Sequence, residues 1–200
     1  MPQRSVALVA GASGSGKSRL AKLTGLPVLR LDDFYRDATA PGMPRGADGN
    51  IDWDDIGAWD ADAAIAALVE LTRTGTALAP DYSIAANART GSHTIDASAS
   101  PAVVAEGIFA TSVLAACREQ GVPALAVWLD RGRWITWWRR LVRDVREHRK
   151  PLRVLWTRGH ALRRAEPGLR RAAITAGFTP MSMRQARAEL GRLADQRFEY

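Results

Sequence analysis

Residues 11–18, with the sequence GASGSGKS, have the types and spacing of a phosphate-binding loop. Glycines give the backbone unusual freedom, so successive N–H groups can surround a phosphate. Lys17 can reach the β- and γ-phosphates of a nucleotide, and the Ser18 hydroxyl suits Mg²⁺. The nucleotide-binding residues predicted here are Gly11, Ala12, Ser13, Gly14, Ser15, Gly16, Lys17, Ser18 and Arg19.

The segments on either side of this loop support the prediction. Residues 4–10 form an apolar run of strand length, and residues 19–23 suit a helix whose N-terminal dipole favours anions. The motif is meaningful in this strand–loop–helix context. The alternative, a glycine-rich turn with an unrelated lysine, is therefore disfavoured.

Acidic residues follow two further predicted strands. Asp32 and Asp33 come at the end of residues 27–31, and Glu106 ends the apolar run of residues 101–105. Ligands of open α/β sheets bind beyond the carboxyl ends of the strands. There, an Asp can bind Mg²⁺ or accept a proton from an attacking hydroxyl, and Glu106 can be a second carboxylate near Mg²⁺. The alternative for one of the two Asp residues is a cap on the next turn.

A long helix is predicted over residues 133–149, and its two sides differ. One side carries Trp134, Trp138, Leu141, Val142 and Val145, for which core packing is favoured over base stacking. The opposite side carries Arg139, Arg140, Arg143, Asp144, Arg146 and Arg149. These arginines either form a solvated face or close over phosphates and stabilise developing charge.

The remaining pattern predicts one α/β domain over residues 1–200, of the P-loop NTPase type, with a mainly parallel five-stranded sheet flanked by helices. A further strand is predicted at residues 124–129, and a β-hairpin insertion at about residues 80–100 with its turn at residues 90–92. Helices are predicted after Asp60 and at residues 112–120, 152–164 and 182–195, with a break at residues 166–168. Residues 39–50 are expected to form a loop.

Composition narrows the class of protein. With 46% hydrophobic and 24% charged residues, the 200-residue chain can form an ordinary core. The single cysteine, Cys117, excludes an internal disulfide, and no stretch approaches the roughly 18 apolar residues of a membrane helix. The first predicted strand leaves no room for a signal peptide. We therefore expect a cytoplasmic protein without a membrane partner.

The chain is basic, with a formal net charge of +7. Its arginines concentrate between Arg131 and Arg192. A basic chain can bind nucleic acid, but an enzyme that handles polyphosphates also needs arginines, and no motif of the usual nucleic-acid-binding modules is present. We expect a small-molecule partner rather than nucleic acid, and a homo-oligomer is compatible with the sequence.

Taken in order, the motifs resemble those of the uridine kinase family of P-loop kinases, in the wider phosphoribulokinase/uridine kinase group. The resemblance covers residues 4–150. Residues 32–35 (DDFY) resemble the family's D-S-F-Y, residues 53–60 (WDDIGAWD) its F-D-H-P-D-A-F-D, and residues 82–89 its Y-D-F-x-x-H-x-R. Residues 104–108 (VAEGI) resemble its E-G-I strand end, and residues 139–144 (RRLVRD) its R-R-x-x-R-D at the start of a lid.

The resemblance implies an ATP- and Mg²⁺-dependent kinase with a helical lid at about residues 133–165. The catalytic residues implied are Asp32, as general base on the acceptor hydroxyl, with Lys17, Arg140 and Arg143 on the phosphates. Ser18 and Glu106 would hold Mg²⁺. The implied acceptor-site residues are Asp32, Tyr35, Asp54, Tyr82, Asn87 and Arg89, with Asp54 on the sugar hydroxyls.

The departures from the family pattern fall on base recognition. Asn87 stands where the family has the histidine that contacts the pyrimidine, Ser83 where it has an aspartate, and Ile56 where it has a proline. An asparagine can donate and accept hydrogen bonds but cannot replace a charged imidazole. Since sites that hydrogen-bond their substrates discriminate strongly, these changes can redirect the specificity.

The leading hypothesis is transfer of the ATP γ-phosphate to a hydroxyl of a nucleoside-like acceptor, with 5′-phosphorylation of uridine or cytidine first. The nearest alternative is a kinase of nicotinamide riboside or another small metabolite. A hypothesis from another class is a nucleotide-dependent switch ATPase that binds a protein or RNA partner. A kinase fold without activity comes last, because Lys17, Ser18, Asp32 and Glu106 are all present.

Overall fold

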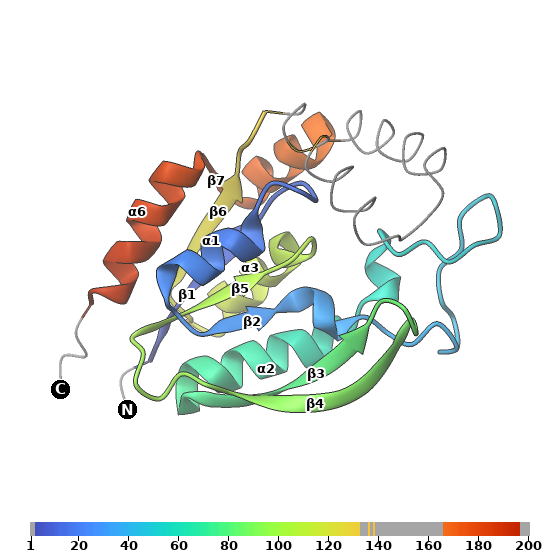
Figure 1. Ribbon diagram of the computed structural model, residues 1–200, viewed down its shortest axis with the longest axis horizontal. Helices are drawn as coiled ribbons and strands as arrows, with labels where there is room; N and C mark the ends of the chain where they lie inside the picture. Colours follow the sequence, from blue (N-terminus) through green and yellow to red (C-terminus); the bar gives the residue numbers. More distant parts are fainter. Residues whose placement is uncertain (1–2, 133–135, 137, 139–165, 197–200) are drawn as a thin grey trace.

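The computed structural model describes residues 3–132, 136, 138 and 166–196. Its centre is a five-stranded sheet with the order β2-β5-β1-β6-β7, in which every pairing is parallel (Figure 1). The strands are β1 (Ser5–Ala10), β2 (Val28–Arg30), β5 (Ala102–Glu106), β6 (Ala124–Leu129) and β7 (Thr179–Met181). The predicted fold class is therefore confirmed. The short edge strand β7 was missed by the sequence pattern.

The central strands are buried on both faces, as expected for a parallel sheet covered by helices. Val6 to Ala10 of β1 and Ala102 to Ala105 of β5 are fully buried. Val9 lies opposite Glu106, and Glu106 lies opposite Arg30 of β2. This register brings the carboxyl ends of β1, β5 and β2 to one edge of the sheet.

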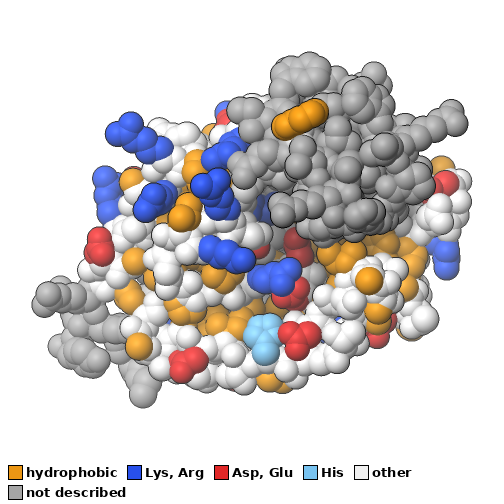
Figure 2. Space-filling view, in the orientation of Figure 1, with side chains coloured by type: hydrophobic (Ala, Val, Ile, Leu, Met, Phe, Trp, Pro, Cys, Tyr) orange, Lys and Arg blue, Asp and Glu red, His pale blue; other side chains and the backbone are white. Residues whose placement is uncertain are grey.

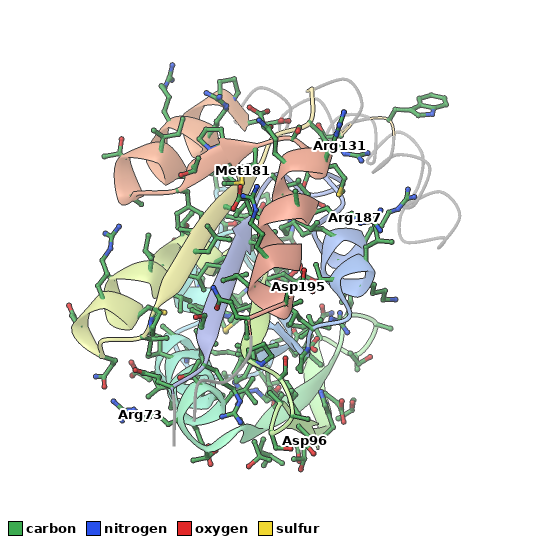
Figure 3. All side chains as sticks on the ribbon, turned by 90° about the vertical axis from the view of Figure 1, so that its left-hand side faces the viewer. Arg73, Asp96, Arg131, Met181, Arg187 and Asp195 are labelled. Atoms are coloured by element: carbon green, nitrogen blue, oxygen red, sulfur yellow. The ribbon has the colours of Figure 1, made fainter. Side chains whose placement is uncertain are left out.

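Helices cover both faces of the sheet. They are α1 (Lys17–Thr24), α2 (Ala61–Thr74), α3 (Ala110–Glu119) and α6 (Met183–Ala194), and residues 166–176 are also helical. Leu20 of α1 and Leu190 of α6 share one apolar cluster with Val127 and Leu129 of β6. Helices α2 and α3 pack on the opposite face with the alternate strand residues. Lys and Arg side chains gather over α1 and α6 (Figure 2), which lie side by side on their face (Figure 3).

An antiparallel hairpin of β3 (Thr76–Ser83) and β4 (Ala88–Asp96) packs against α2. The hairpin was predicted, but the turn predicted at residues 90–92 is wrong. Those residues lie inside β4, where Gly91 pairs with Asp81 beside a bulge, a common place for glycine in a strand. The chain turns instead at residues 84–87, where Asn87 has a φ of 50° and the Ser83 hydroxyl accepts from Ala86 N–H.

Two predicted helix starts are confirmed, and for α2 the capping residue Asp60 was also predicted. Asp60 caps α2 by accepting from Ala63 N–H, and Ser182 forms a capping box with Gln185 at the start of α6. Helix α3 starts at Ala110, two residues before the prediction. No helix among the described residues has the length and apolar character needed to cross a membrane.

Two expectations for the arginine-rich region are wrong. Residues 166–168, predicted as a break, are helical. Proline has no N–H to donate, but the residues that follow it can still form a helix. Trp138 is 59% exposed and so is not a core residue. The remaining predictions for the helices at residues 133–149 and 152–164 lie outside the described residues.

Candidate active site

The phosphate-binding loop connects β1 to α1 at the carboxyl edge of the sheet. Gly16, the residue before α1, has a φ of 100°. At Gly11, a Cβ atom would lie 2.9 Å from Ser15 Oγ and 3.1 Å from the Leu129 carbonyl oxygen. The side chain of Lys17 folds back on the loop, where Nζ donates to the Gly11 carbonyl at 2.9 Å. Glycine is therefore required at two positions for the loop to close tightly around its own lysine.

Two carboxylates lie beside this loop. Glu106 ends β5 and is 4% exposed, and the Ser18 hydroxyl is close enough to act on the pKa of its carboxylate. Burial raises the pKa of Glu106, which the Lys17 charge and the Ser18 hydrogen bond oppose, while the Asp32 charge raises it further. Lys17, Ser18, Asp32 and Glu106 thus form one electrostatically coupled group.

Asp32 lies in the 3₁₀-helix η1 (Leu31–Phe34), which follows β2. Its Oδ1 accepts from Ile108 N–H at 3.0 Å, a bond that joins η1 to the segment after β5. Between the two, a Cβ on Gly107 would lie 2.7 Å from Asp32 Oδ1 and 2.8 Å from Leu31 Cβ. The glycine after Glu106 therefore lets the backbone approach and hold the Asp32 carboxylate.

The neighbouring Asp33 has a different environment. It is 6% exposed, and its Oδ1 lies 3.5 Å from Arg30 NH2. Burial raises its pKa, against the opposing charge of Arg30. The alternative suggested for one of the two Asp residues, a cap on the next turn, is wrong for Asp33. Its carboxylate forms an ion pair with Arg30 instead.

Aromatic side chains gather next to η1. The ring of Tyr35 lies 5.6 Å from Trp53, 5.6 Å from Tyr82 and 5.8 Å from Phe109, between centroids. Tyr35 Oη donates to the Trp53 carbonyl at 2.9 Å, while the buried Oη of Tyr82 has no hydrogen-bond partner among the described residues. Burial raises the pKa of Tyr82, and the nearby Asp37 charge adds to the rise. The result is an aromatic wall with one unsatisfied hydroxyl.

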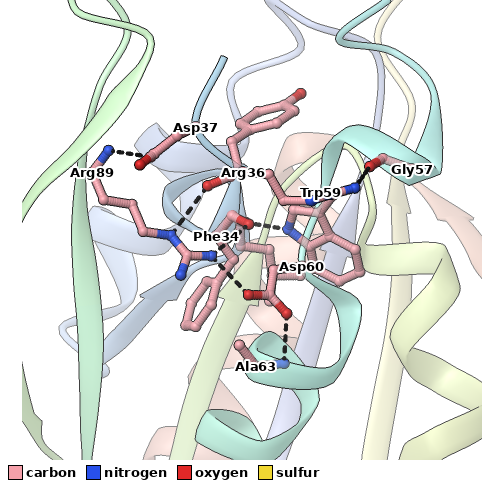
Figure 4. Close-up of polar contacts among 10 residues, drawn as sticks. Phe34, Arg36, Asp37, Gly57, Trp59, Asp60, Ala63 and Arg89 are labelled. Carbon is pink, nitrogen blue, oxygen red and sulfur yellow. Dashed lines mark hydrogen bonds and ion pairs between the residues drawn. The ribbon is translucent and has the colours of Figure 1, made fainter. Parts of the chain in front are cut away.

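Arg89, one of the predicted acceptor-site residues, is bound to protein groups (Figure 4). Its NH2 lies 2.9 Å from Asp60 Oδ2, its Nε donates to the Tyr35 carbonyl, and its backbone N–H donates to Asp37 Oδ1. Burial would raise the pKa of Asp60, but hydrogen bonds from Arg89 and from Ala63 N–H outweigh it, so the pKa is lowered. Arg89 thus ties the hairpin to η1 and to the start of α2.

The other predicted site residues are more scattered. Asp54 is exposed in the segment before α2, where its backbone N–H donates to Asp52 Oδ1. Asn87 is at the tip of the hairpin, and its carbonyl accepts from Ala38 N–H. Arg19 is exposed on α1, and Arg140 and Arg143 lie outside the described residues.

The sequence interpretation missed Gly107 and Phe109. Their signal was available, since Gly107 directly follows the predicted strand end at Glu106 and Phe109 is two residues further along. The close approach of Gly107 to Asp32, however, depends on two segments 75 residues apart and cannot be read from either alone.

The oxygen ligands at this edge fit Mg²⁺. Among the described residues, no group of three or more His, Cys, Asp or Glu side chains is placed to hold a metal ion. In phosphate-transfer sites, however, Mg²⁺ is bound by one or two carboxylates together with substrate phosphates and water. The Ser18 hydroxyl and the Glu106 carboxylate, which are neighbours at the end of β5, are groups of that kind.

Comparison with known proteins agrees with this arrangement. The model of the phosphoribulokinase/uridine kinase family matches residues 6–152. None of the curated proteins matches the chain.

Solved structures share the fold at low sequence identity. A protein described as a fructose transport system kinase from Silicibacter sp. TM1040 aligns with a TM-score of 0.58 and 17% identity, over 91% of this chain and 90% of that one. The protein YGR205w aligns with a TM-score of 0.53 and 13% identity, over 92% and 88%. A protein described as a uridine kinase from Bacillus stearothermophilus gives 0.48 and 20%, over 86% and 87%. At these identities the likeness of the first two structures concerns the fold alone, and nothing is concluded from the third, whose TM-score is 0.48.

Proposed function

Since the chain belongs to the phosphoribulokinase/uridine kinase family, we propose that it transfers the γ-phosphate of ATP to a hydroxyl of a small, nucleoside-like acceptor. The observation that carries the proposal is the position of Asp32. This carboxylate is fixed by Ile108 N–H and lies in the same charged group as Lys17, Ser18 and Glu106. A proton acceptor thus stands beside a phosphate-binding loop.

On the donor side, the N–H groups of residues 11–18 surround the phosphates of ATP. Lys17 exchanges its contact with the Gly11 carbonyl for the β- and γ-phosphates. Ser18 and Glu106 would hold Mg²⁺, whose charge would offset that of the phosphates. Arg140 and Arg143, which the family resemblance assigns to the phosphates, would add positive charge there.

On the acceptor side, one oxygen of Asp32 stays bonded to Ile108 N–H while the other receives the proton of the acceptor hydroxyl. The hydroxyl oxygen forms a bond to the γ-phosphorus as the bond to the bridging oxygen of ADP breaks. The products are ADP and the phosphate ester, with the proton left on Asp32.

The acceptor pocket lies against the aromatic wall. The rings of Tyr35 and Tyr82 would pack against a flat base, and the buried Tyr82 Oη, unpartnered among the described residues, would hydrogen-bond a base that reaches it. Asp54 is proposed to bind sugar hydroxyls. Arg89 and Asn87 support this pocket by shaping the hairpin, because Arg89 is held by Asp60 and Asn87 forms the turn. Uridine and cytidine are the leading acceptors, and nicotinamide riboside, which also has a flat ring, is next.

The test is ADP production from Mg²⁺–ATP against a panel of acceptors. The panel contains uridine, cytidine, the other nucleosides, nicotinamide riboside, pantothenate and simple sugars, with the Lys17→Ala variant as blank. Stimulation by uridine or cytidine supports the proposal in full. Stimulation by another acceptor supports the phosphate transfer and moves the specificity. A flat panel over slow background hydrolysis contradicts the proposal and favours the switch ATPase with a protein or RNA partner.

A further inference from the structure

Trp59 is buried between the two segments that hold Asp32. It is 3% exposed, and its indole Nε1–H donates to the Leu31 carbonyl at 2.7 Å. Its ring stacks on Phe109, with 5.1 Å between the centroids and 25° between the planes. Leu31 directly precedes Asp32, and Phe109 directly follows Ile108, whose N–H donates to Asp32 Oδ1. One side chain therefore contacts both segments that determine where the Asp32 carboxylate lies.

The backbone on either side of Trp59 is also bonded to η1 and the residues that follow it. The Ala58 carbonyl accepts from Arg36 N–H at 2.9 Å. Asp60 N–H donates to the Phe34 carbonyl at 3.0 Å (Figure 4). The segment that carries the indole therefore cannot shift relative to η1 without breaking these bonds.

The bond to the Leu31 carbonyl affects Asp32 because this carbonyl and the Asp32 N–H belong to one peptide unit. The peptide unit is planar, so a fixed direction of the Leu31 carbonyl also fixes the direction of the Asp32 N–H and the position of its Cα. Leu31 is fully buried, so bulk water does not compete for its carbonyl. Ile108 N–H holds the carboxylate at the other end of the residue. The backbone and the side chain of Asp32 are therefore each held by a separate hydrogen bond.

Packing alone does not require the indole N–H. A phenylalanine ring could also stack on Phe109, but it has no donor for a carbonyl. A buried tryptophan usually has a partner for its N–H, and here the partner is the carbonyl next to the proposed base.

We propose that Trp59 is a positioning residue, whose N–H sets the place from which Asp32 accepts the proton of the acceptor. The inference rests on the proposed function, in which Asp32 is the general base. Trp59 acts through Asp32, because its own side chain is buried among protein groups.

The experiment removes the N–H of Trp59 in two ways. Trp59→Phe keeps an aromatic ring, and replacement of Trp59 by 3-benzothienylalanine keeps the bicyclic shape with sulfur in place of the N–H. Trp128→Phe, which removes an indole that is 5% exposed in β6, is the matched control for lost packing. Acceptor-dependent kcat and KM, ATP affinity and thermal melting are measured on each protein. The hydrogen exchange of the Ile108 amide is measured by NMR without ligands.

We expect both Trp59 variants to lose about tenfold in kcat, since a displacement of about 1 Å costs on the order of 10²-fold and the loss of one bond should move Asp32 by less. The KM of the acceptor and the affinity for ATP should change little. The Ile108 amide should exchange faster, because its acceptor, Asp32 Oδ1, is held less firmly. Trp128→Phe should keep its kcat at a temperature where it is folded.

Wild-type kcat in both Trp59 variants would overturn the inference. A normal kcat in the benzothienylalanine variant alone would overturn it too, because the shape of the ring and not the N–H would then matter. A raised KM with unchanged kcat, or a fall in kcat without faster Ile108 exchange, would show that Trp59 does not act through Asp32. An equal fall of kcat in Trp128→Phe would show a general effect of lost packing. If the wild type phosphorylates no acceptor, the proposed function fails, and the exchange of the Ile108 amide alone decides whether Trp59 holds Asp32.

Discussion

Gly107→Ala tests whether the backbone after β5 positions Asp32. The new Cβ would lie 2.7 Å from Asp32 Oδ1 and 2.8 Å from Leu31 Cβ, where ordinary contacts begin at 3.4 Å. Neither neighbour moves easily, because Leu31 is fully buried and Asp32 Oδ1 is bonded to Ile108 N–H. The carboxylate must therefore move by about 0.7 Å.

A displacement of about 1 Å costs on the order of 10²-fold in rate, so we expect Gly107→Ala to lower kcat by roughly 10- to 100-fold. Overpacking should also reduce the free energy of unfolding by about 1–3 kcal/mol. The affinity for ATP should change little, because the loop of residues 11–18 is not touched.

The assay is acceptor-dependent ADP production, with ATP binding and thermal melting measured on the same samples. Gly191→Ala is the control, since its Cβ would point into open space within α6 and alanine favours a helix. A folded Gly107→Ala variant with unchanged kcat would refute the reasoning, because either Asp32 moves freely or it takes no part in the chemistry.

Three further predictions concern the loop, the pocket and the hairpin. Lys17→Ala should weaken ATP binding about tenfold or more, the loss of one charged contact, and unchanged binding in a titration would show that the loop does not hold phosphates. Tyr82→Phe should leave the free protein as stable or more so, because it removes an unpartnered buried hydroxyl, yet raise the KM of the acceptor; an unchanged KM excludes Tyr82 from the pocket. Asp60→Asn keeps a capping side chain but loses the charge paired with Arg89, so it should cost less than about 1 kcal/mol at neutral pH. Folding lowers the pKa of Asp60, so the difference in the free energy of unfolding between the wild type and Asp60→Asn should be present above the ordinary pKa of 3.8. It should vanish as the pH falls through the lowered pKa. A difference in thermal unfolding that does not depend on pH would contradict this prediction.

Local sequence patterns were sufficient to predict those features that a single short segment determines. The loop of residues 11–18 has its own glycines and lysine, and the predicted cap Asp60 acts on Ala63, three residues away. The meeting of Asp32 and Glu106 follows from a general rule, because the ends of neighbouring parallel strands lie at one edge of a sheet.

The features that the sequence did not reveal depend on contacts between residues that lie far apart in the chain. Residues 90–92 have the composition of a turn, but the pairing of Gly91 with Asp81 places them inside β4. The turn of the hairpin lies at Asn87 instead, which has a positive φ. The three residues of β7 form a strand because they pair in parallel with β6 at the edge of the sheet. Arg89 pairs with Asp60, which is 29 residues away in the sequence, so this ion pair has no local signature.

The central claim is that Asp32 accepts the proton of the acceptor beside the phosphate-binding loop. The most direct measurement compares Asp32→Asn with Asp33→Asn for acceptor-dependent kcat and for ATP affinity. The account predicts that Asp32→Asn binds ATP normally and loses about 10²-fold or more in kcat. Asp33→Asn, whose ion pair with Arg30 is structural, should keep most of its kcat while its thermal stability changes. Equal kcat in Asp32→Asn and the wild type, or a larger loss in Asp33→Asn, would contradict the account.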